Sequence, residues 1–136
     1  NIEKQIASLN ELGVDKVTFI YCQYSQKKYK INFDKLDKLL INSSQQSGRS
    51  DIIKIDICDS FQNFLSLYPN SYLFNFSSNH IDTKKSDIQT IILGCEGGFS
   101  DNEISLINKE NIVGINSNII LKSETAAIII ASKILV

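Results

Sequence analysis

The chain has 136 residues, of which 43% are hydrophobic and 21% charged, and its formal net charge is −1. This length suits one domain with its own core, and the charge balance excludes a generic polyanion-binding protein of the histone kind. The three cysteines, Cys22, Cys58 and Cys95, form no CxxC pair, so the sequence predicts neither a disulfide framework nor a zinc site, and a reducing cytoplasm fits best. The sequence shows no signal peptide and no apolar run long enough to span a membrane.

The predicted elements alternate between helical periodicity and β-branched or aromatic runs. In chain order they are a helix from Ile2 to Leu12 before Gly13, a strand over 16–22, a helix from Asp34 to about Gln46, a strand over 52–58, a short helix over 60–68, strands over 71–76 and 89–94, a helix from Ser100 to about Lys109, a strand over 111–116 and a last helix from Glu124. Residues 77–87 are predicted to form an exposed loop. This order predicts an α/β fold with a mostly parallel sheet flanked by helices, in one domain over 1–136.

The clearest local signal is the start of the helix at Ser100. Ser100 at the N-cap and Glu103 three residues later predict a capping box, and Phe99 with Ile104 occupies the positions of a hydrophobic staple. The last helix, rich in isoleucine and alanine, is apolar around most of its circumference, which predicts burial on more than one side and a subunit interface.

Half of the six glycines lie in one turn, between the strand over 89–94 and the helix at Ser100. Gly94 allows the strand to end sharply, and Gly97 with Gly98 allows the backbone to approach a ligand without a Cβ in the way. Ligands of α/β proteins bind at such strand ends, but the segment matches neither a dinucleotide fingerprint nor a phosphate loop. Glu96 either complements the dipole of the following helix or binds the ligand.

Four segments, in order, resemble the RsmE-type methyltransferases, which methylate N3 of a uridine in 16S ribosomal RNA. The turn "LGCEGGFSDNEI" resembles the family's "GPEGGFS" signature, and the other three matching segments are "LNELGVDKVTF" (9–19), "QQSGR" (45–49) and "ILKSETAA" (120–127). The resemblance covers essentially the whole chain. It implies membership of the SPOUT superfamily, with a trefoil knot in the C-terminal half, S-adenosyl-L-methionine as cofactor and a homodimer that acts on the small ribosomal subunit in the cytoplasm. The chain begins at Asn1 without an initiator methionine, and nothing in it corresponds to the family's N-terminal RNA-binding β-barrel, so we expect a domain of a longer protein.

The resemblance also assigns the site residues. Three loops are expected to bind the cofactor, through Phe74, Asn75 and Phe76, through Gly94, Glu96, Gly97 and Gly98, and through Ile115, Ile120 and Leu121. Glu96 or Glu124 is the candidate proton acceptor, and Lys122 or Arg49 is the candidate that stabilises the uracil anion. Each of these residues also has a purely structural interpretation. Glu124 is equally suited to the first turn of the last helix, Arg49 to a salt bridge, and Lys122 to an exposed position on the surface. The basic cluster of Lys27, Lys28 and Lys30 is either a solvated face or a contact with RNA phosphates.

The sequence departs from the family pattern at several positions. Cys95 replaces a proline and Lys122 an arginine, and Gln23 with Tyr24 stands where relatives carry "ER". These losses leave open a dimeric RNA-binding or assembly module with weak catalysis, and also a methyltransferase that acts on another RNA position. A thiol hydrolase with Cys95 as nucleophile and His80 as base is a further alternative.

Overall fold

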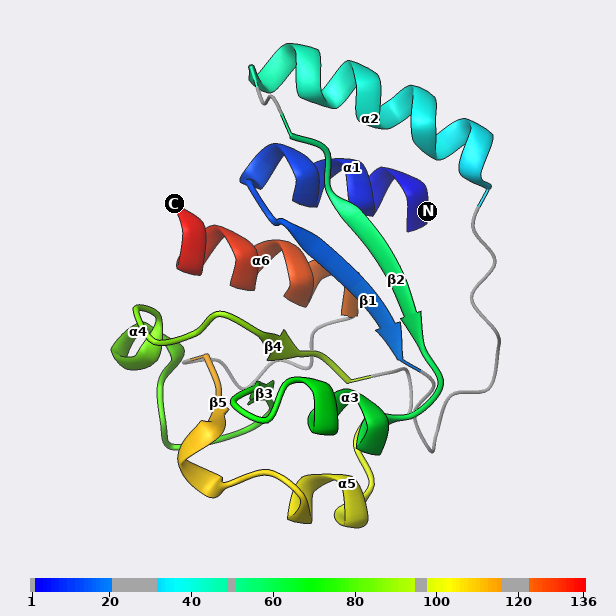
Figure 1. Ribbon diagram of the computed structural model, residues 1–136. Helices are drawn as coiled ribbons and strands as arrows, with labels where there is room; N and C mark the ends of the chain where they lie inside the picture. The colour runs from blue at the N-terminus through cyan, green and yellow to red at the C-terminus, as the bar shows by residue number, and fades with distance from the viewer. Residues whose placement is uncertain (1, 21–31, 49–50, 95–97, 116–122) are drawn as a thin grey trace.

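The computed structural model describes residues 2–20, 32–48, 51–94, 98–115 and 123–136, without the side chains of Ser123 and Glu124 (Figure 1). Its elements are α1 (Ile2–Leu12), β1 (Lys16–Ile20), α2 (Phe33–Ser47), β2 (Lys54–Cys58), α3 (Phe61–Leu67), β3 (Tyr72–Phe74), α4 (Ile81–Lys84), β4 (Ile91–Ile92), α5 (Asp101–Ser105), a 3₁₀ turn (Lys109–Asn111), β5 (Ile112–Val113) and α6 (Ser123–Leu135).

All strand pairs among the described residues are parallel, which confirms the predicted α/β class. β1 pairs with β2 in a two-stranded sheet, from Lys16 opposite Lys54 to Ile20 opposite Cys58. The other sheet has the order β4-β3-β5, so β3 is its central strand. β4 and β5 are shorter than the apolar runs that predicted them.

The core lies in three clusters, and α6 contributes to two of them. Figure 1 shows α1 between α2 and α6, and the first cluster joins these helices through Ile6, Leu9, Leu36, Leu40, Ala127 and Ala131. The second cluster gathers Ile20, Phe61, Phe64, Leu73, Ile92 and Ile107 around α3 and the segment that follows α5. The third places Ala126 and Ile130 of α6 against Ile81, Ile88 and Val113. The apolar residues of α6 are therefore buried on two sides, as the sequence predicted.

The predicted capping box is present at α5. The Ser100 backbone N–H donates to Glu103 Oε1 at 2.9 Å, and the Glu103 N–H donates to Ser100 Oγ at 3.1 Å. α2 is capped by Asn32, whose side chain accepts from the Lys35 N–H, and it ends at Gly48 with φ +73°. Both ends of α2 are thus set by local chemistry.

Two predictions about the second half of the chain were wrong. The segment 77–87 is not simply an exposed loop, because it contains α4 and places Ile81 fully inside the core. The helix that begins after Ser100 ends at Ser105 rather than near Lys109. Ile107 is buried in the second cluster, and Asn108 starts a separate 3₁₀ turn by accepting from the Glu110 N–H at 3.2 Å.

A buried asparagine connects three elements. Asn10 is completely buried, and its Nδ2 donates to Ser43 Oγ and Ser44 Oγ, both at 3.1 Å. Its Oδ1 accepts from the Ile53 N–H at 3.0 Å, just before β2. One α1 side chain therefore fixes the end of α2 and the entry to β2, and since all these groups are buried, each bond replaces one that water made in the unfolded chain.

Replacing Asn10 with alanine should lower the free energy of unfolding by about 3 kcal/mol, since the Ile53 N–H and two hydroxyls lose their buried partner. Urea denaturation measures this change, with Asn102→Ala on the exposed side of α5 as the matched control. The control should stay within about 0.5 kcal/mol of the unmodified protein. An Asn10→Ala protein as stable as the control would show that the network contributes nothing.

Candidate functional site

The carboxyl ends of β3, β4 and β5 meet at one edge of their sheet. Leu73 of β3 lies opposite Ile92 of β4 and Ile112 of β5. Because the three strands are parallel, the segments that follow them leave the sheet on the same side. Residues 74–76, 93–94 and 114–115 therefore gather at this edge, as expected of three loops that share a ligand.

The segments after β3 and β5 are in direct backbone contact at Gly114. The Asn75 N–H donates to the Val113 carbonyl oxygen at 3.0 Å. A Cβ built on Gly114 would lie 2.8 Å from the Asn75 carbonyl oxygen and 3.2 Å from the Ser77 nitrogen. No side chain fits there without moving the backbone. Gly114 was not among the predicted site residues, although a glycine directly after an apolar strand is a signal for such a close approach.

Further hydrogen bonds fasten the segment after β3 to β5. Ser77 Oγ donates to the Ile112 carbonyl oxygen at 2.9 Å. The Gly114 N–H donates to the Asn79 carbonyl oxygen at 2.9 Å, and the Ile81 N–H donates to the Gly114 carbonyl oxygen at 2.8 Å. Gly114 thus uses both its backbone groups to hold residues 79–81 beside β5.

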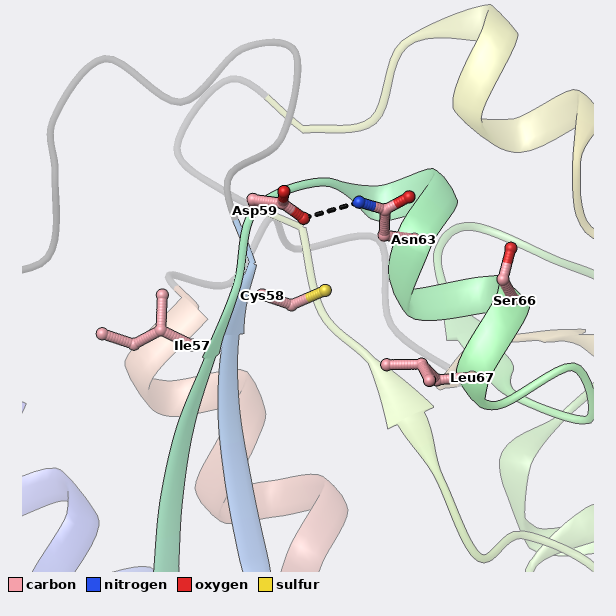
Figure 2. Close-up of a pocket in the computed structure, with 6 residues that line it drawn as sticks. All are labelled: Ile57, Cys58, Asp59, Asn63, Ser66 and Leu67. Carbon is pink, nitrogen blue, oxygen red and sulfur yellow. Dashed lines mark hydrogen bonds between the residues drawn. The ribbon is translucent and has the colours of Figure 1, made fainter.

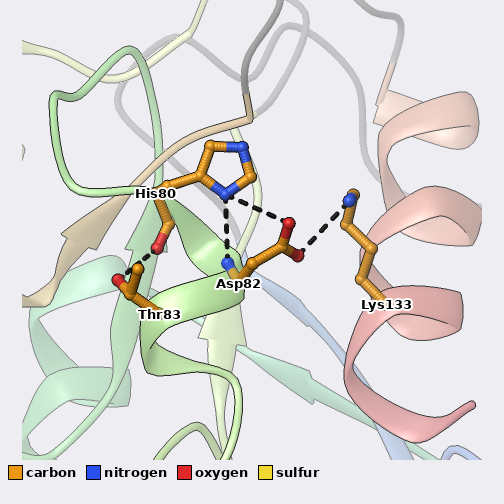
Figure 3. Close-up of polar contacts among 4 residues, drawn as sticks. All are labelled: His80, Asp82, Thr83 and Lys133. Carbon is orange, nitrogen blue, oxygen red and sulfur yellow. Dashed lines mark hydrogen bonds and ion pairs between the residues drawn. The ribbon is translucent and has the colours of Figure 1, made fainter.

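His80 and Asp82 order the same segment, and Asp82 joins it to α6 (Figure 3). Its Nδ1 accepts from the Asp82 N–H at 3.2 Å and caps α4, and Thr83 Oγ1 donates to its carbonyl oxygen at 2.7 Å. Asp82 in turn pairs with Lys133 of α6 at 3.3 Å. These contacts give His80 a structural role. Cys95, its partner in the thiol hydrolase alternative, lies outside the described residues.

The two ends of the glycine turn lie against each other. A Cβ on Gly94 would meet the Phe99 ring at 3.3 Å and the Gly98 Cα at 3.4 Å, and Gly98 has φ +74°, a conformation that favours glycine. Gly94 and Gly98, the described ends of the turn, are therefore close together just after β4. Gly97 and Glu96, between these ends, lie outside the described residues.

The described candidates for cofactor binding all lie at this edge. Phe74 and Ile115 pack partly against the third core cluster. Asn75 Oδ1 accepts from the Phe76 N–H at 2.9 Å, and Phe76 exposes 69% of its surface. An exposed aromatic ring beside close-packed backbone suits a ligand with a flat apolar part.

Only the backbone of Glu124 is described, and it lies in the first turn of α6. The remaining candidates lie outside the described residues: Glu96, Gly97, Ile120, Leu121, Lys122, Arg49, Lys27, Lys28 and Lys30. The end of α2 and the start of β2, between which Arg49 stands in the sequence, lie at the amino ends of β1 and β2, whereas the glycine turn follows β4 (Figure 1). Within one chain the structure therefore does not bring the neighbours of Arg49 to the edge that carries the glycine turn.

No three His, Cys, Asp or Glu side chains group as metal ligands within the part of the chain that the structure describes. None of the helices described is long and apolar enough to cross a membrane.

The model of the RNA methyltransferase domain family matches residues 1–135. The chain belongs to this family. A relative from Helicobacter pylori (strain ATCC 700392 / 26695), the "Ribosomal RNA small subunit methyltransferase E", is 34% identical over 135 residues, which cover 97% of this chain and 60% of the relative. This RNA methyltransferase domain thus spans about 60% of the length of that relative.

Solved structures share the fold of this RNA methyltransferase domain. A putative methyltransferase from Legionella pneumophila, in complex with the bound cofactor SAM, superposes with a TM-score of 0.73 at 26% identity, over 98% of this chain and 60% of the other. A probable rRNA-methyltransferase from Porphyromonas gingivalis reaches a TM-score of 0.76 at 21% identity, over 96% and 59%. The second likeness shows the fold alone.

Replacing Gly114 with alanine should lower the free energy of unfolding by about 1–3 kcal/mol, because the new methyl group would push the Asn75 carbonyl away. We also expect the affinity for S-adenosylmethionine, the cofactor that the resemblance predicts, to fall about tenfold, a change of about 1.4 kcal/mol in binding free energy. Calorimetry of unfolding and of binding measures the two effects.

Gly13→Ala is the matched control for this substitution. Gly13 has φ +98° with open space around it, so alanine there strains the backbone far from the β3–β5 contact. The control should lose stability but keep its cofactor affinity. Equal cofactor affinities in the two variants would contradict a role for the Gly114 contact in the site.

Proposed function

We propose that this protein transfers a methyl group from S-adenosyl-L-methionine to N3 of a uridine in 16S ribosomal RNA. The observation that carries the proposal is the convergence of 74–76, 93–94 and 114–115 at the carboxyl edge of β4-β3-β5. The family and the name of the Helicobacter pylori relative support RNA of the small subunit as substrate. The bound SAM in the Legionella pneumophila structure supports the cofactor.

The residues at this edge fit such a cofactor. The exposed ring of Phe76 and the half-buried Ile115 offer apolar surface for an adenine. A Cβ on Gly98 would meet no atom within 4 Å, so there is room for a ligand beside it, and Gly94, Gly97 and Gly98 are the proposed positions where backbone approaches the cofactor. Phe74, Asn75, Glu96, Ile120 and Leu121 complete the proposed cofactor pocket. The bound cofactor supplies an electrophilic methyl group on a sulfonium.

The protein has two tasks in this reaction. Uridine N3 carries a proton at neutral pH, and Glu96 or Glu124 is the proposed acceptor of that proton. Charge then builds on the uracil oxygens, where Lys122 is the proposed stabilising group. Because the end of α2 and the start of β2, which flank Arg49, lie at the amino ends of β1 and β2, we propose that Arg49 stabilises the uracil anion only from the second subunit of a dimer.

The remaining parts of the proposal concern assembly. We propose a homodimer that pairs through α6, since Ile129 belongs to none of the three core clusters although the residues on either side are packed in them. Lys27, Lys28 and Lys30 are the proposed contacts with RNA phosphates. A trefoil knot around the β3–β5 contact and a cytoplasmic location complete the proposal.

Methyl transfer from labelled S-adenosylmethionine to small ribosomal subunits that lack the modification tests the function. The expected product is N3-methyluridine in 16S RNA, which stops primer extension because the methyl group blocks base pairing. A folded protein that binds no S-adenosylmethionine in calorimetry would contradict the proposal and favour the assembly module.

Glutamine variants of Glu96 and Glu124 identify the proton acceptor, with Glu110→Gln in the exposed 3₁₀ turn as the matched control. Loss of the acceptor should lower kcat about 10²- to 10⁴-fold. Full activity in both variants would exclude both residues from that role.

A further inference from the structure

A hollow lies outside the proposed cofactor edge, where β2 ends and α3 begins (Figure 2). Its volume is about 470 Å³, and it is lined by Ile57, Cys58, Asp59, Asn63, Ser66 and Leu67. This volume lies within the range of small-molecule sites in proteins. The proposed cofactor pocket uses none of these residues.

The polar wall of the hollow is held in a fixed arrangement. Asn63 Nδ2 donates to Asp59 Oδ1 at 2.7 Å, and the Asn63 backbone N–H donates to Ser60 Oγ at 3.0 Å. Cys58 Sγ donates to the Ser60 carbonyl oxygen at 3.4 Å. Asp59 and Asn63 are both exposed. A carboxylate acceptor and an amide donor therefore stand side by side, facing solvent.

Next to this polar wall the lining of the hollow is apolar, with Ile57 on β2 and Leu67 one turn after Asn63 on α3. Leu67 exposes 70% of its surface, and in Figure 2 its side chain extends from α3 toward Cys58. α3 is held against β1 by Tyr68, whose hydroxyl accepts from Lys16 Nζ at 3.1 Å. This hydrogen bond, together with the Asp56 carboxylate, raises the pKa of Lys16. The helix α3, which carries Leu67, is thus anchored to β1 at its carboxyl end.

The hollow adjoins the glycine turn. Phe61 lies two residues after Asp59, and its ring centroid is 5.9 Å from that of Phe99. The Phe99 ring is in turn the group that a Cβ on Gly94 would meet at 3.3 Å. Two aromatic rings therefore separate the polar wall of the hollow from the proposed cofactor loop.

We propose that this hollow binds the sugar edge of the pyrimidine ribonucleotide that is methylated, a proposal that rests on the function proposed above. The ribose 2′-hydroxyl donates to Asp59, and the neighbouring pyrimidine O2 accepts the second hydrogen of Asn63 Nδ2. The base packs on Leu67, as an extruded base packs on apolar side chains. N3 lies on the other side of O2, so these two hydrogen bonds leave N3 uncontacted.

This arrangement allows the protein to distinguish RNA from DNA, because only RNA carries the 2′-hydroxyl. A ribonucleotide should bind about tenfold more tightly than its deoxy counterpart, the factor for one hydrogen bond to a charged group. An alanine at Asp59 should abolish that preference, whereas a general loss of structure would weaken both ligands equally.

The test titrates the full protein chain with uridine 5′-monophosphate and with the 2′-deoxy analogue, followed by NMR of the backbone amides. We expect shifts at Cys58, Asp59 and Asn63, a preference for the ribonucleotide, and loss of that preference in Asp59→Ala. Asp56→Ala, on the same strand but outside the hollow, is the matched control and should keep the preference. Leu67→Ala should weaken both nucleotides and leave their ratio unchanged.

Absence of these shifts, equal affinities in the unmodified protein, or an unchanged ratio in Asp59→Ala would each overturn the proposal. S-adenosylmethionine affinity, measured in parallel, should not change in Asp59→Ala, and a loss there would also overturn it. A protein that binds S-adenosylmethionine but methylates no RNA would contradict the proposed function, while the ratio of the two nucleotides would still decide the role of the hollow.

Discussion

The backbones that follow β3 and β5 touch at Gly114, and the geometry of the candidate site depends on that contact. A Cβ there would lie 2.8 Å from the Asn75 carbonyl oxygen, and hydrogen bonds from Asn75 to Val113 and between Gly114 and residues 79–81 close the same contact. The strands themselves are only two or three residues long. Backbone contacts beyond the strand ends therefore align the three segments at this edge.

A pocket built mainly from backbone tolerates changes of side chain. Cys95 replaces a proline of the related pattern and Lys122 replaces an arginine, yet the described ends of the glycine turn lie together and Gly98 adopts φ +74°. Cofactor binding in our account depends on glycines and strand ends, whereas proton transfer and RNA recognition depend on side chains. Substitution of side chains should therefore impair proton transfer and RNA recognition before it impairs cofactor binding.

Most of the fold could be predicted where the signal was local. Ser100 and Glu103 predicted the capping box, Gly13 marked the end of α1, and the apolar surface of α6 predicted its burial on two sides. Four residues are too few for helical periodicity, so α4 was missed although Ile81 is fully buried. Asn10 gave no signal, since its partners lie 33 to 43 residues away. Motifs named the cofactor loops, but the hollow beside Asp59 arises from the packing of α3 against the end of β2, which no motif describes.

Hydrogen–deuterium exchange with and without S-adenosylmethionine tests the central claim most directly, since it reports where the cofactor binds without prior assumptions about the site. The account predicts slower exchange, in the presence of cofactor, in peptides that cover 74–80, 93–99 and 112–123. Exchange in α2 and in the middle of α3 should be unchanged. Protection confined to other segments, or none at saturating cofactor, would contradict the claim that the carboxyl edge of β4-β3-β5 is the cofactor site.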